Sequence, residues 1–244
     1  MRAITRAGDF LAEHGRDIDR ARFRFHFAGG ALADVVDALA AYQNADGGFG
    51  HGLEPDIAAP ASNPFATEWA LLICLQAGVP RDHPLLARTV AYLEASQFDD
   101  GSWRFAPEVY EHELAPWFRG WEWPNLNPAG PLAGLLRDLG LGSDRLHARV
   151  AALFARLERP ADLLGDGFYD ARPYALYALP AGEVAAQERY RAGTLWWLIR
   201  QHVEGKSEDA AHFFEYARAP HLYTARNLPA DILAAQLDRL AAEQ

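Results

Sequence analysis

Two carboxylates flank a single proline in the stretch formed by residues 50–56. Because proline restricts the backbone, Glu54 and Asp56 can keep a fixed separation, and His51 lies within loop reach of both. Two carboxylates in one pocket tend to split their pKa values, which equips one of them as a general acid. We therefore take Glu54, Asp56 and His51 as candidate catalytic residues for a cation-forming cyclase or a glycosidase. The alternative is that the two carboxylates cap amides of the loop.

A second stretch, residues 110–127, combines aromatic and polar side chains, and three of the seven tryptophans lie within it. Aromatic faces can stabilise a carbocation, and they can equally stack on a sugar ring whose hydroxyl groups bond to asparagine and glutamate. The structural alternative is that the rings pack over one end of the fold. The predicted substrate-binding residues are His112, Trp117, Arg119, Trp121, Glu122, Trp123 and Asn125, together with Asp170 and Tyr174 from the C-terminal third.

A metal site would need the two stretches to meet. His51, Glu54, Asp56 and His112 could then supply mixed nitrogen and oxygen ligands. The sequence has no spacing signature for such a site, so we predict no metal and no cofactor. The single cysteine, Cys74, lies in an apolar run. It excludes disulfides and cysteine-rich zinc sites, and we expect a buried, inert thiol.

Composition and charge limit the choice of partners. The chain has 244 residues, half of them hydrophobic, and a formal net charge of −10. This charge argues against non-specific binding to nucleic acid or anionic lipid, because both need a basic face. No apolar run approaches the roughly 20 residues needed to cross a bilayer, and the start of the chain lacks a signal-peptide core. We predict one cytoplasmic domain over residues 1–244 whose partner is an apolar or neutral small molecule.

The spacing of apolar residues predicts helices nearly everywhere and no alternating strands. Residues 69–75 are apolar all round, as expected of an inner helix. Long and short links alternate along the chain. If consecutive helices run antiparallel, all long links emerge at one end, and about eleven helices form the array. The clearest helical stripes lie in residues 32–39, 86–93, 132–139 and 146–157, and the long links are residues 44–65, 98–127 and 159–170.

A turn motif recurs along the chain. Near residues 43–50 and 97–103 a helix-terminal glutamine precedes an Asp-Gly pair and then an aromatic residue, and a degraded copy lies near residues 165–168. Units that repeat at this spacing form stacked arrays in which no unit buries its apolar face alone. The last seven residues match residues 37–43 at five positions. The array could therefore need a partner, such as a second copy of the chain, for closure.

The Gln, Asp-Gly and aromatic pattern resembles the repeats of squalene and oxidosqualene cyclases and of protein prenyltransferase β subunits. The resemblance implies an all-α fold, the α/α toroid, in which about eleven to twelve antiparallel helices form a double ring. In the cyclases such repeats are structural. The chain lacks the Asp-x-Asp-Asp acid motif, the zinc-binding Asp and Cys pair, and the Asp-Asp-x-x-Asp motif that binds diphosphate. No catalytic residue can therefore be carried over from these families.

Two classes of function follow. The first is an enzyme related to the terpenoid cyclases that acts on an isoprenoid or another apolar molecule by acid-initiated chemistry, or a carbohydrate-active hydrolase or lyase that uses the same carboxylates. The second is a non-catalytic module that binds a ligand or a protein. A deep apolar cavity would favour an enzyme that acts on an isoprenoid. A shallow polar groove would favour a carbohydrate-active enzyme, and a filled centre would favour a non-catalytic module.

Overall fold

The computed structural model describes residues 2–177, 185–207, 210–217 and 223–243. Over these ranges the chain forms thirteen α-helices, two short 3₁₀ helices and no β-strand, which confirms the all-helical prediction. The count exceeds the expected eleven mainly because short helices form within the links. The helices are α1 (Arg2–His14), α2 (Asp17–Phe27), α3 (Leu32–Ala40), α4 (Pro64–Ala77), α5 (Pro84–Ser96), η1 (Pro107–Glu111), α6 (Pro116–Arg119), α7 (Leu126–Asp138), α8 (Asp144–Leu157), η2 (Pro160–Leu163), α9 (Phe168–Tyr177), α10 (Ala185–Val203), α11 (Ala210–Glu215), α12 (Tyr223–Asn227) and α13 (Ala230–Glu243).

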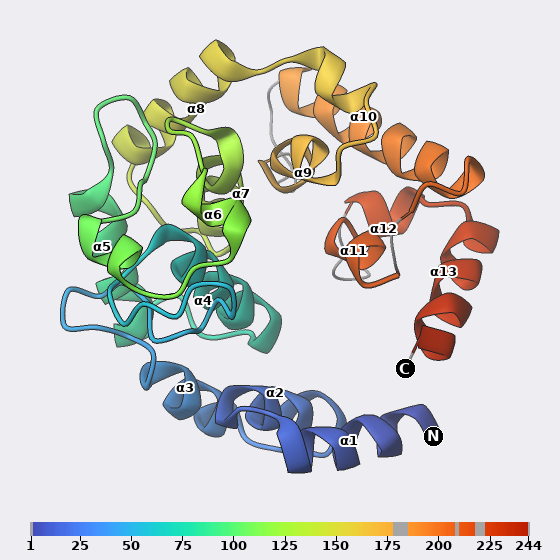
Figure 1. Ribbon diagram of the computed structural model, residues 1–244, viewed down its shortest axis with the longest axis horizontal. Helices are drawn as coiled ribbons and strands as arrows, with labels where there is room; N and C mark the ends of the chain where they lie inside the picture. The colour runs from blue at the N-terminus through green and yellow to red at the C-terminus, as the bar shows by residue number, and fades with distance from the viewer. Residues whose placement is uncertain (1, 178–184, 208–209, 218–222, 244) are drawn as a thin grey trace.

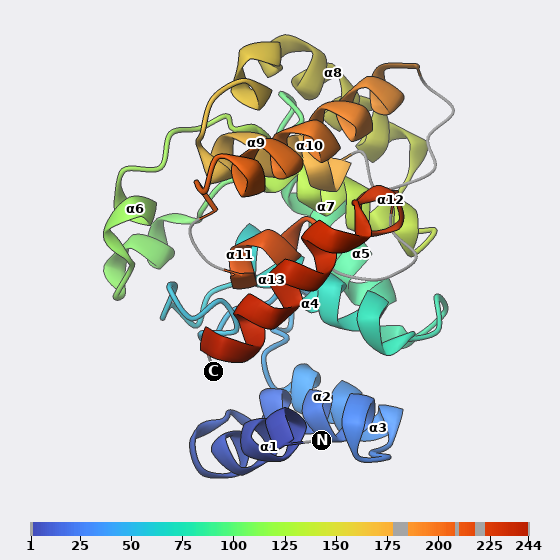
Figure 2. The ribbon, with the colours of Figure 1, turned by 90° about the vertical axis from the view of Figure 1, so that its right-hand side faces the viewer.

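The helices follow one another around an arc, and α13 returns to the side of the molecule where α1 begins (Figure 1). Helices α4, α7 and α9 pack against one another in that order on the inner side of the arc. Helix α8 packs outside α7, and α10 packs outside α9. Figure 2 shows α1, α2 and α3 grouped at one end of the molecule. Inner helices therefore alternate with outer ones along the chain from α4 to α10.

Helix α4 is the inner helix that the apolar run predicts. The Asn63 side chain caps its start by accepting a hydrogen bond from the Ala66 amide at 2.9 Å, and Pro64 occupies the first turn. Gly78 ends the helix with a φ of 69°, a value that glycine adopts without steric cost. Nearly every residue between these caps is buried, including Cys74. Burial raises the pKa of the Cys74 thiol to about 12, as expected for an inert thiol.

The first two repeat turns are held by equivalent glutamines. The Gln43 amide donates to the Gly47 carbonyl at 3.0 Å and to the Leu85 carbonyl at 3.1 Å, in the first turn of α5. The Gln97 amide donates to the Gly101 carbonyl at 3.4 Å and to the Leu146 carbonyl at 3.2 Å, in the first turn of α8. Each glutamine therefore ties its own turn to the start of an outer helix.

The Asp-Gly pairs shape these same turns. Asp46 Oδ1 accepts a hydrogen bond from the Gly48 amide, and Asp100 Oδ1 accepts one from the Ser102 amide, each at 2.9 Å. Such bonds between an aspartate and the amide two residues later define Asx turns. Gly47 and Gly101 have φ values of 94° and 90°, and a Cβ atom on either would collide with a backbone carbonyl of α5 or α8. The glycines are therefore required by conformation and by close packing.

The third predicted turn is built differently. Neither Gly165 nor Gly167 has a positive φ. The Gly165 carbonyl instead accepts a hydrogen bond from the Trp197 indole of α10 at 2.9 Å, and Asp166 pairs with Lys206 at 2.8 Å. This copy keeps the residue types of the motif without its geometry.

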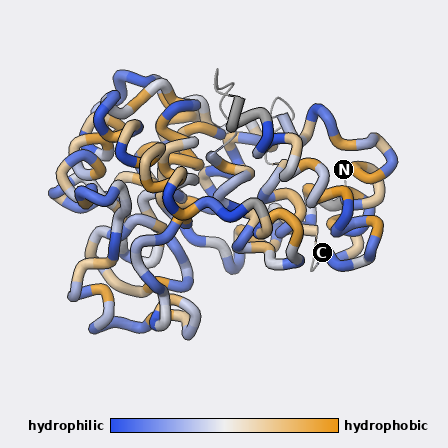
Figure 3. The backbone as a smooth tube through the Cα atoms, turned by 90° about the horizontal axis from the view of Figure 1, so that it is seen from above, coloured by the Kyte–Doolittle hydropathy of each residue, from blue (hydrophilic) through white to orange (hydrophobic). Residues whose placement is uncertain are grey.

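The long links lie together, as the alternation of link lengths predicts. Ala58 donates to the Glu113 carbonyl at 3.0 Å, and Ala115 donates to the Asp56 carbonyl at 2.9 Å, so the first two links are joined by backbone hydrogen bonds. Residues of the second and third links line a common pocket. Hydrophobic and hydrophilic residues alternate over short distances along the chain (Figure 3), and no helix among the described residues is long and apolar enough to cross a membrane.

Candidate functional site

A cavity of about 380 Å³ lies between the joined links and helices α4, α9 and α11. We call it the aromatic–carboxylate cavity, because aromatic rings and charged or amide side chains both line it. The aromatic residues are Phe65, Trp69, Trp117, Phe118, Trp121 and Tyr169. The polar residues are Glu54, Asp56, Glu68, Asn127, Arg172 and Glu215.

Glu54 is held at this cavity by two hydrogen bonds. Its Oε2 accepts from the Trp69 indole N–H at 2.6 Å, and its Oε1 accepts from the Asp56 amide at 3.3 Å. Burial raises the pKa of Glu54 above its ordinary value, and the neighbouring Asp56 and Glu68 carboxylates raise it further, while the two N–H donors partly offset these effects. The result is a carboxyl group that keeps its proton to a higher pH than an exposed glutamate does.

Asp56 and His51 lie differently from Glu54. The Asp56 side chain is exposed and lines the same cavity. His51 is also exposed, has a φ of 56°, and contacts Asn44 Oδ1 through Nε2 at 2.9 Å, away from the residues that line the cavity. The structure therefore brings together the two carboxylates of the predicted catalytic group but not the histidine.

The tryptophans of the second link divide into exposed and packed rings. Trp121 and Trp123 lie 5.2 and 6.4 Å from the Phe65 ring and cover a small second core, which is the packing role considered above as the alternative. Trp121 also lines the cavity, whereas Trp123 does not. Trp117 is 57% exposed at the cavity wall and does not belong to the second core. Trp117 is therefore the tryptophan of this link that is most available to a ligand.

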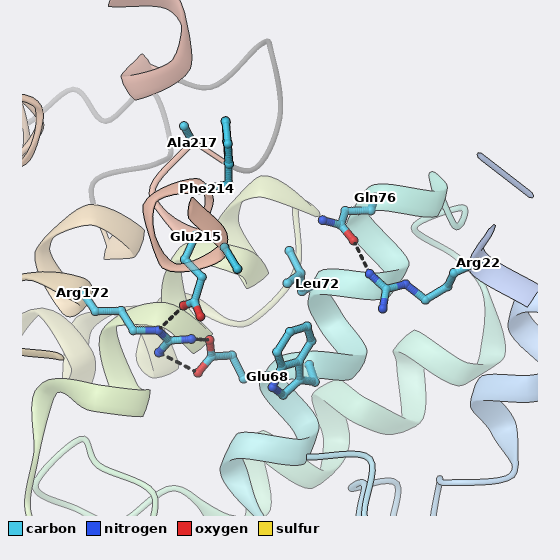
Figure 4. Close-up of a pocket in the computed structure, with 10 residues that line it drawn as sticks. Arg22, Glu68, Leu72, Gln76, Arg172, Phe214, Glu215 and Ala217 are labelled. Carbon is cyan, nitrogen blue, oxygen red and sulfur yellow. Dashed lines mark hydrogen bonds and ion pairs between the residues drawn. The ribbon is translucent and has the colours of Figure 1, made fainter. Parts of the chain in front are cut away.

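A buried ion cluster forms the polar wall of the cavity. Arg172 Nη2 lies 2.6 Å from Glu68 Oε1, and its Nε lies 3.0 Å from Glu215 Oε2 (Figure 4). Its Nη1 donates to Asn127 Oδ1 at 2.8 Å. Burial disfavours the charge of Arg172, but the two carboxylates outweigh burial and raise the pKa of the guanidinium. Glu68 and Glu215 therefore both pair with the Arg172 guanidinium.

Three further predicted residues surround a separate, polar pocket of about 280 Å³, which is lined by Glu122, Asn125 and Asp170. Asn125 also caps α7, because its Oδ1 accepts from the Asn127 amide at 2.9 Å. Tyr174 is fully buried, and its hydroxyl accepts from the Arg159 amide at 2.6 Å and bonds to Asp162 Oδ2 at 2.8 Å. This hydroxyl therefore ties α9 to the third link.

His112 and Arg119 lie on the outer surface of the second link. Both side chains are exposed, and Arg119 Nη2 donates to the backbone carbonyl of His112 at 3.2 Å. Neither residue lines the aromatic–carboxylate cavity. No group of three or more histidine, cysteine, aspartate or glutamate side chains suited to hold a metal ion occurs within the described ranges.

Sequence reasoning missed the members of the ion cluster. Glu68 had a usable signal, because it is the only charged residue of a largely apolar helix, and the structure leaves it only 3% exposed. Such a buried carboxylate needs a cationic partner. Arg172 and Glu215 had no such signal, because each lies in a short segment of mixed polarity. In comparisons with known proteins, the chain matched no protein-family model, no curated protein and no solved structure.

Proposed function

We propose that the protein is an enzyme with an α/α-toroid fold that uses Glu54 to donate a proton to a small uncharged molecule in the aromatic–carboxylate cavity. The observation that carries this proposal is the placement of Glu54. Its carboxyl group has a raised pKa, is held by the Trp69 indole, and lines a cavity that is also lined by six aromatic residues. A general acid must still hold its proton near the pH at which the enzyme works, and a raised pKa makes this possible.

The raised pKa limits the kind of atom that Glu54 can protonate. A carboxyl group that keeps its proton more firmly is a weaker acid, so it suits an oxygen atom better than the carbon of an alkene. We infer that the substrate has an oxygen function, such as an isoprenoid-like alcohol, ether or epoxide. The rings of Trp69, Trp117 and Trp121 would then face the positive charge that develops when the carbon–oxygen bond breaks.

A carbohydrate is the second candidate substrate, and the polar wall of the cavity favours it. Asn127, Arg172 and Glu215 line the side formed by the ion cluster, where an apolar ligand would cover charged groups without bonding to them. Hydroxyl groups could bond there while a sugar ring stacks on Trp117. Asp56 would then supply the second carboxylate that glycoside cleavage requires.

The size of the cavity supports a small-molecule site over a protein-interaction module. Ligand sites in proteins commonly enclose roughly 300–1,000 Å³, and about 380 Å³ lies within that range. An isoprenoid of one or two repeating units, or a sugar of one or two rings, is the size of substrate that we expect.

Mass spectrometry of products formed from oxygenated isoprenoids and neutral oligosaccharides tests the proposal. The parent protein should convert members of one of these classes, and Glu54→Gln should lose that activity while staying folded, because a glutamine oxygen can still accept from Trp69. Glu111→Gln is the matched control, since Glu111 is an exposed acid of the second link. Equal conversion by parent and Glu54→Gln would refute the role of Glu54, and no conversion across both classes would refute the enzyme proposal.

A further inference from the structure

A second cavity, of about 370 Å³, is lined mainly by residues of α2, α4, α9 and α11. We call it the Arg22 cavity. Figure 4 shows Arg22 and Gln76 at one side of it and Arg172 with its two carboxylate partners at the other. None of the candidate site residues predicted from the sequence lines this cavity. The function proposed above therefore gives no role to its Arg22 side.

Arg22, on α2, is a half-buried cation without a counter-ion among the described residues. Its Nη2 donates to Gln76 Oε1 at 3.1 Å, and its Nε is enclosed without a hydrogen-bond partner. Asp19 attracts Arg22 from beyond ion-pair distance and is itself paired with Arg16 at 2.8 Å. Burial lowers the pKa of Arg22, as expected for a guanidinium taken from water without a carboxylate beside it. An unpaired guanidinium at a cavity wall is suited to bind an anion.

The Gln76 amide makes a carboxylate the anion that fits best. Because Gln76 Oε1 accepts from Arg22, the amide nitrogen of Gln76 points away from the guanidinium, and it donates to no described residue. A carboxylate has two oxygens, so one could accept from Arg22 while the other accepts from Gln76. The planar fork of an arginine matches the geometry of a carboxylate, and a bond between two charged groups is stronger than one between neutral groups.

The surface beside this polar end is apolar. Leu72 lies four residues before Gln76 on α4, so the two side chains share one face of the helix. Leu72 and Phe214 of α11 both line the cavity, and Figure 4 shows them between Arg22 and the Arg172 cluster. A ligand that reaches from Arg22 along this surface gains from burial of a hydrocarbon chain.

The far end of the cavity leaves no place for a second charge on the ligand. Arg172 pairs there with Glu68 at 2.6 Å and with Glu215 at 3.0 Å. A further charged group would be buried beside groups that already have partners, and such burial is costly. Glu68 lies eight residues before Gln76, or roughly 12 Å along the helix axis, so it acts on an anion at Arg22 far more weakly than Arg22 does in direct contact.

We propose that the Arg22 cavity binds a monocarboxylate with a short apolar chain. Its carboxylate lies against the Arg22 guanidinium and the Gln76 amide, and its chain covers Leu72 and Phe214. The volume of about 370 Å³ lies within the range of small-molecule sites. The proposal needs no proton transfer by Glu54, so it is tested separately from the function proposed above.

Calorimetry at neutral pH with matched ligands tests this inference. The probes are hexanoate and octanoate, the alcohols of the same chain lengths, and acetate. At least one of the two longer carboxylates should bind about tenfold more tightly than its matched alcohol, because the alcohol lacks the charge-assisted bond to Arg22. It should also bind about tenfold more tightly than acetate, because acetate has no chain to cover Leu72.

Two substitutions on α2 test the role of the guanidinium. Arg22→Gln should reduce the affinity for the carboxylate to that of the matched alcohol. Arg24→Gln, at an exposed position of the same helix, should leave the affinity unchanged. Undiminished binding of the carboxylate by a folded Arg22→Gln variant would overturn the proposal.

A third variant separates binding from folding. Gln76→Glu places a carboxylate beside Arg22, so it should raise the melting temperature and also abolish binding of the carboxylate probe. Binding that persists in this variant would contradict the proposal, because the site would already hold an internal anion. An alcohol that binds the parent as tightly as its matched carboxylate would also overturn it, and so would the absence of binding of both longer carboxylates to the folded parent.

Discussion

Arg172 of α9 and Glu68 of α4 are 104 residues apart in the sequence, and yet they form a buried ion pair with Nη2 and Oε1 2.6 Å apart. The pair joins two inner helices, α4 and α9, each of which also packs against α7. Both residues line the aromatic–carboxylate cavity and also a second cavity, of about 370 Å³. A change at this pair should therefore affect the stability of the inner helices and the shape of both cavities.

Arg172→Met should lower the free energy of unfolding by about 3 kcal/mol, because it leaves the Glu68 carboxylate buried without its partner. Urea denaturation measures the change. Arg149→Met is the control, since Arg149 pairs with Asp99, whose side chain is almost completely exposed, and such a pair contributes less than about 1 kcal/mol. Equal losses in the two variants would contradict the importance of the buried pair.

Substitution of Gly47, in the first repeat turn, should cost more stability than substitution of Gly52. Gly47→Ala should destabilise the protein by about 2 kcal/mol more than Gly52→Ala, because a Cβ atom at Gly47 would collide with the Arg88 carbonyl of α5. Gly52 also has a positive φ, but no atom lies within 4 Å of an added Cβ there, so its cost of about 1 kcal/mol is conformational alone. Thermal unfolding of both variants tests the difference. Similar melting temperatures would show that α5 yields to the added methyl group.

Glu54 should make stability depend on pH. Its folded-state pKa is raised, so the folded protein holds this proton more tightly than the unfolded chain does. The contribution is complete below the ordinary pKa of 4.5 and is lost as pH rises through the raised value. Relative to the parent, Glu54→Gln should therefore gain stability as pH increases across this window. Urea denaturation at several pH values checks this, and a constant difference between the two proteins would contradict it.

Trp117 should matter for binding and not for folding. Because its side chain is 57% exposed, Trp117→Ala should change the free energy of unfolding by less than about 0.5 kcal/mol. Removal of a ring from the cavity wall should nevertheless weaken substrate binding by about tenfold or more. Phe65→Ala, at a residue of the second core that is 5% exposed, should instead cost about 3 kcal/mol. A Trp117→Ala variant that binds substrate normally would place the ligand elsewhere.

Local patterns in the sequence predicted the elements of the fold better than they predicted the site. The glutamine and Asp-Gly pairs near Gln43 and Gln97 form hydrogen bonds within a few residues, so a local pattern can indicate the turns that they stabilise. The pairing of Glu68 with Arg172 depends instead on how α4, α7 and α9 pack, which no local pattern specifies. His51 shows that residues close in the sequence need not share a site in the structure. Its nearness to Glu54 in the sequence suggested a shared site, but a positive φ turns the chain and places its ring on Asn44.

A carbon-13 NMR titration of the glutamate side-chain carboxyl groups tests the central claim most directly. The Glu54 resonance can be assigned by its loss in Glu54→Gln, with Glu111→Gln as the comparison for an exposed residue. We predict a Glu54 midpoint above the ordinary 4.5, and a lower midpoint in Asp56→Asn, because the Asp56 charge contributes to the increase. A Glu54 midpoint at or below 4.5 would contradict its role as the proton donor of this cavity.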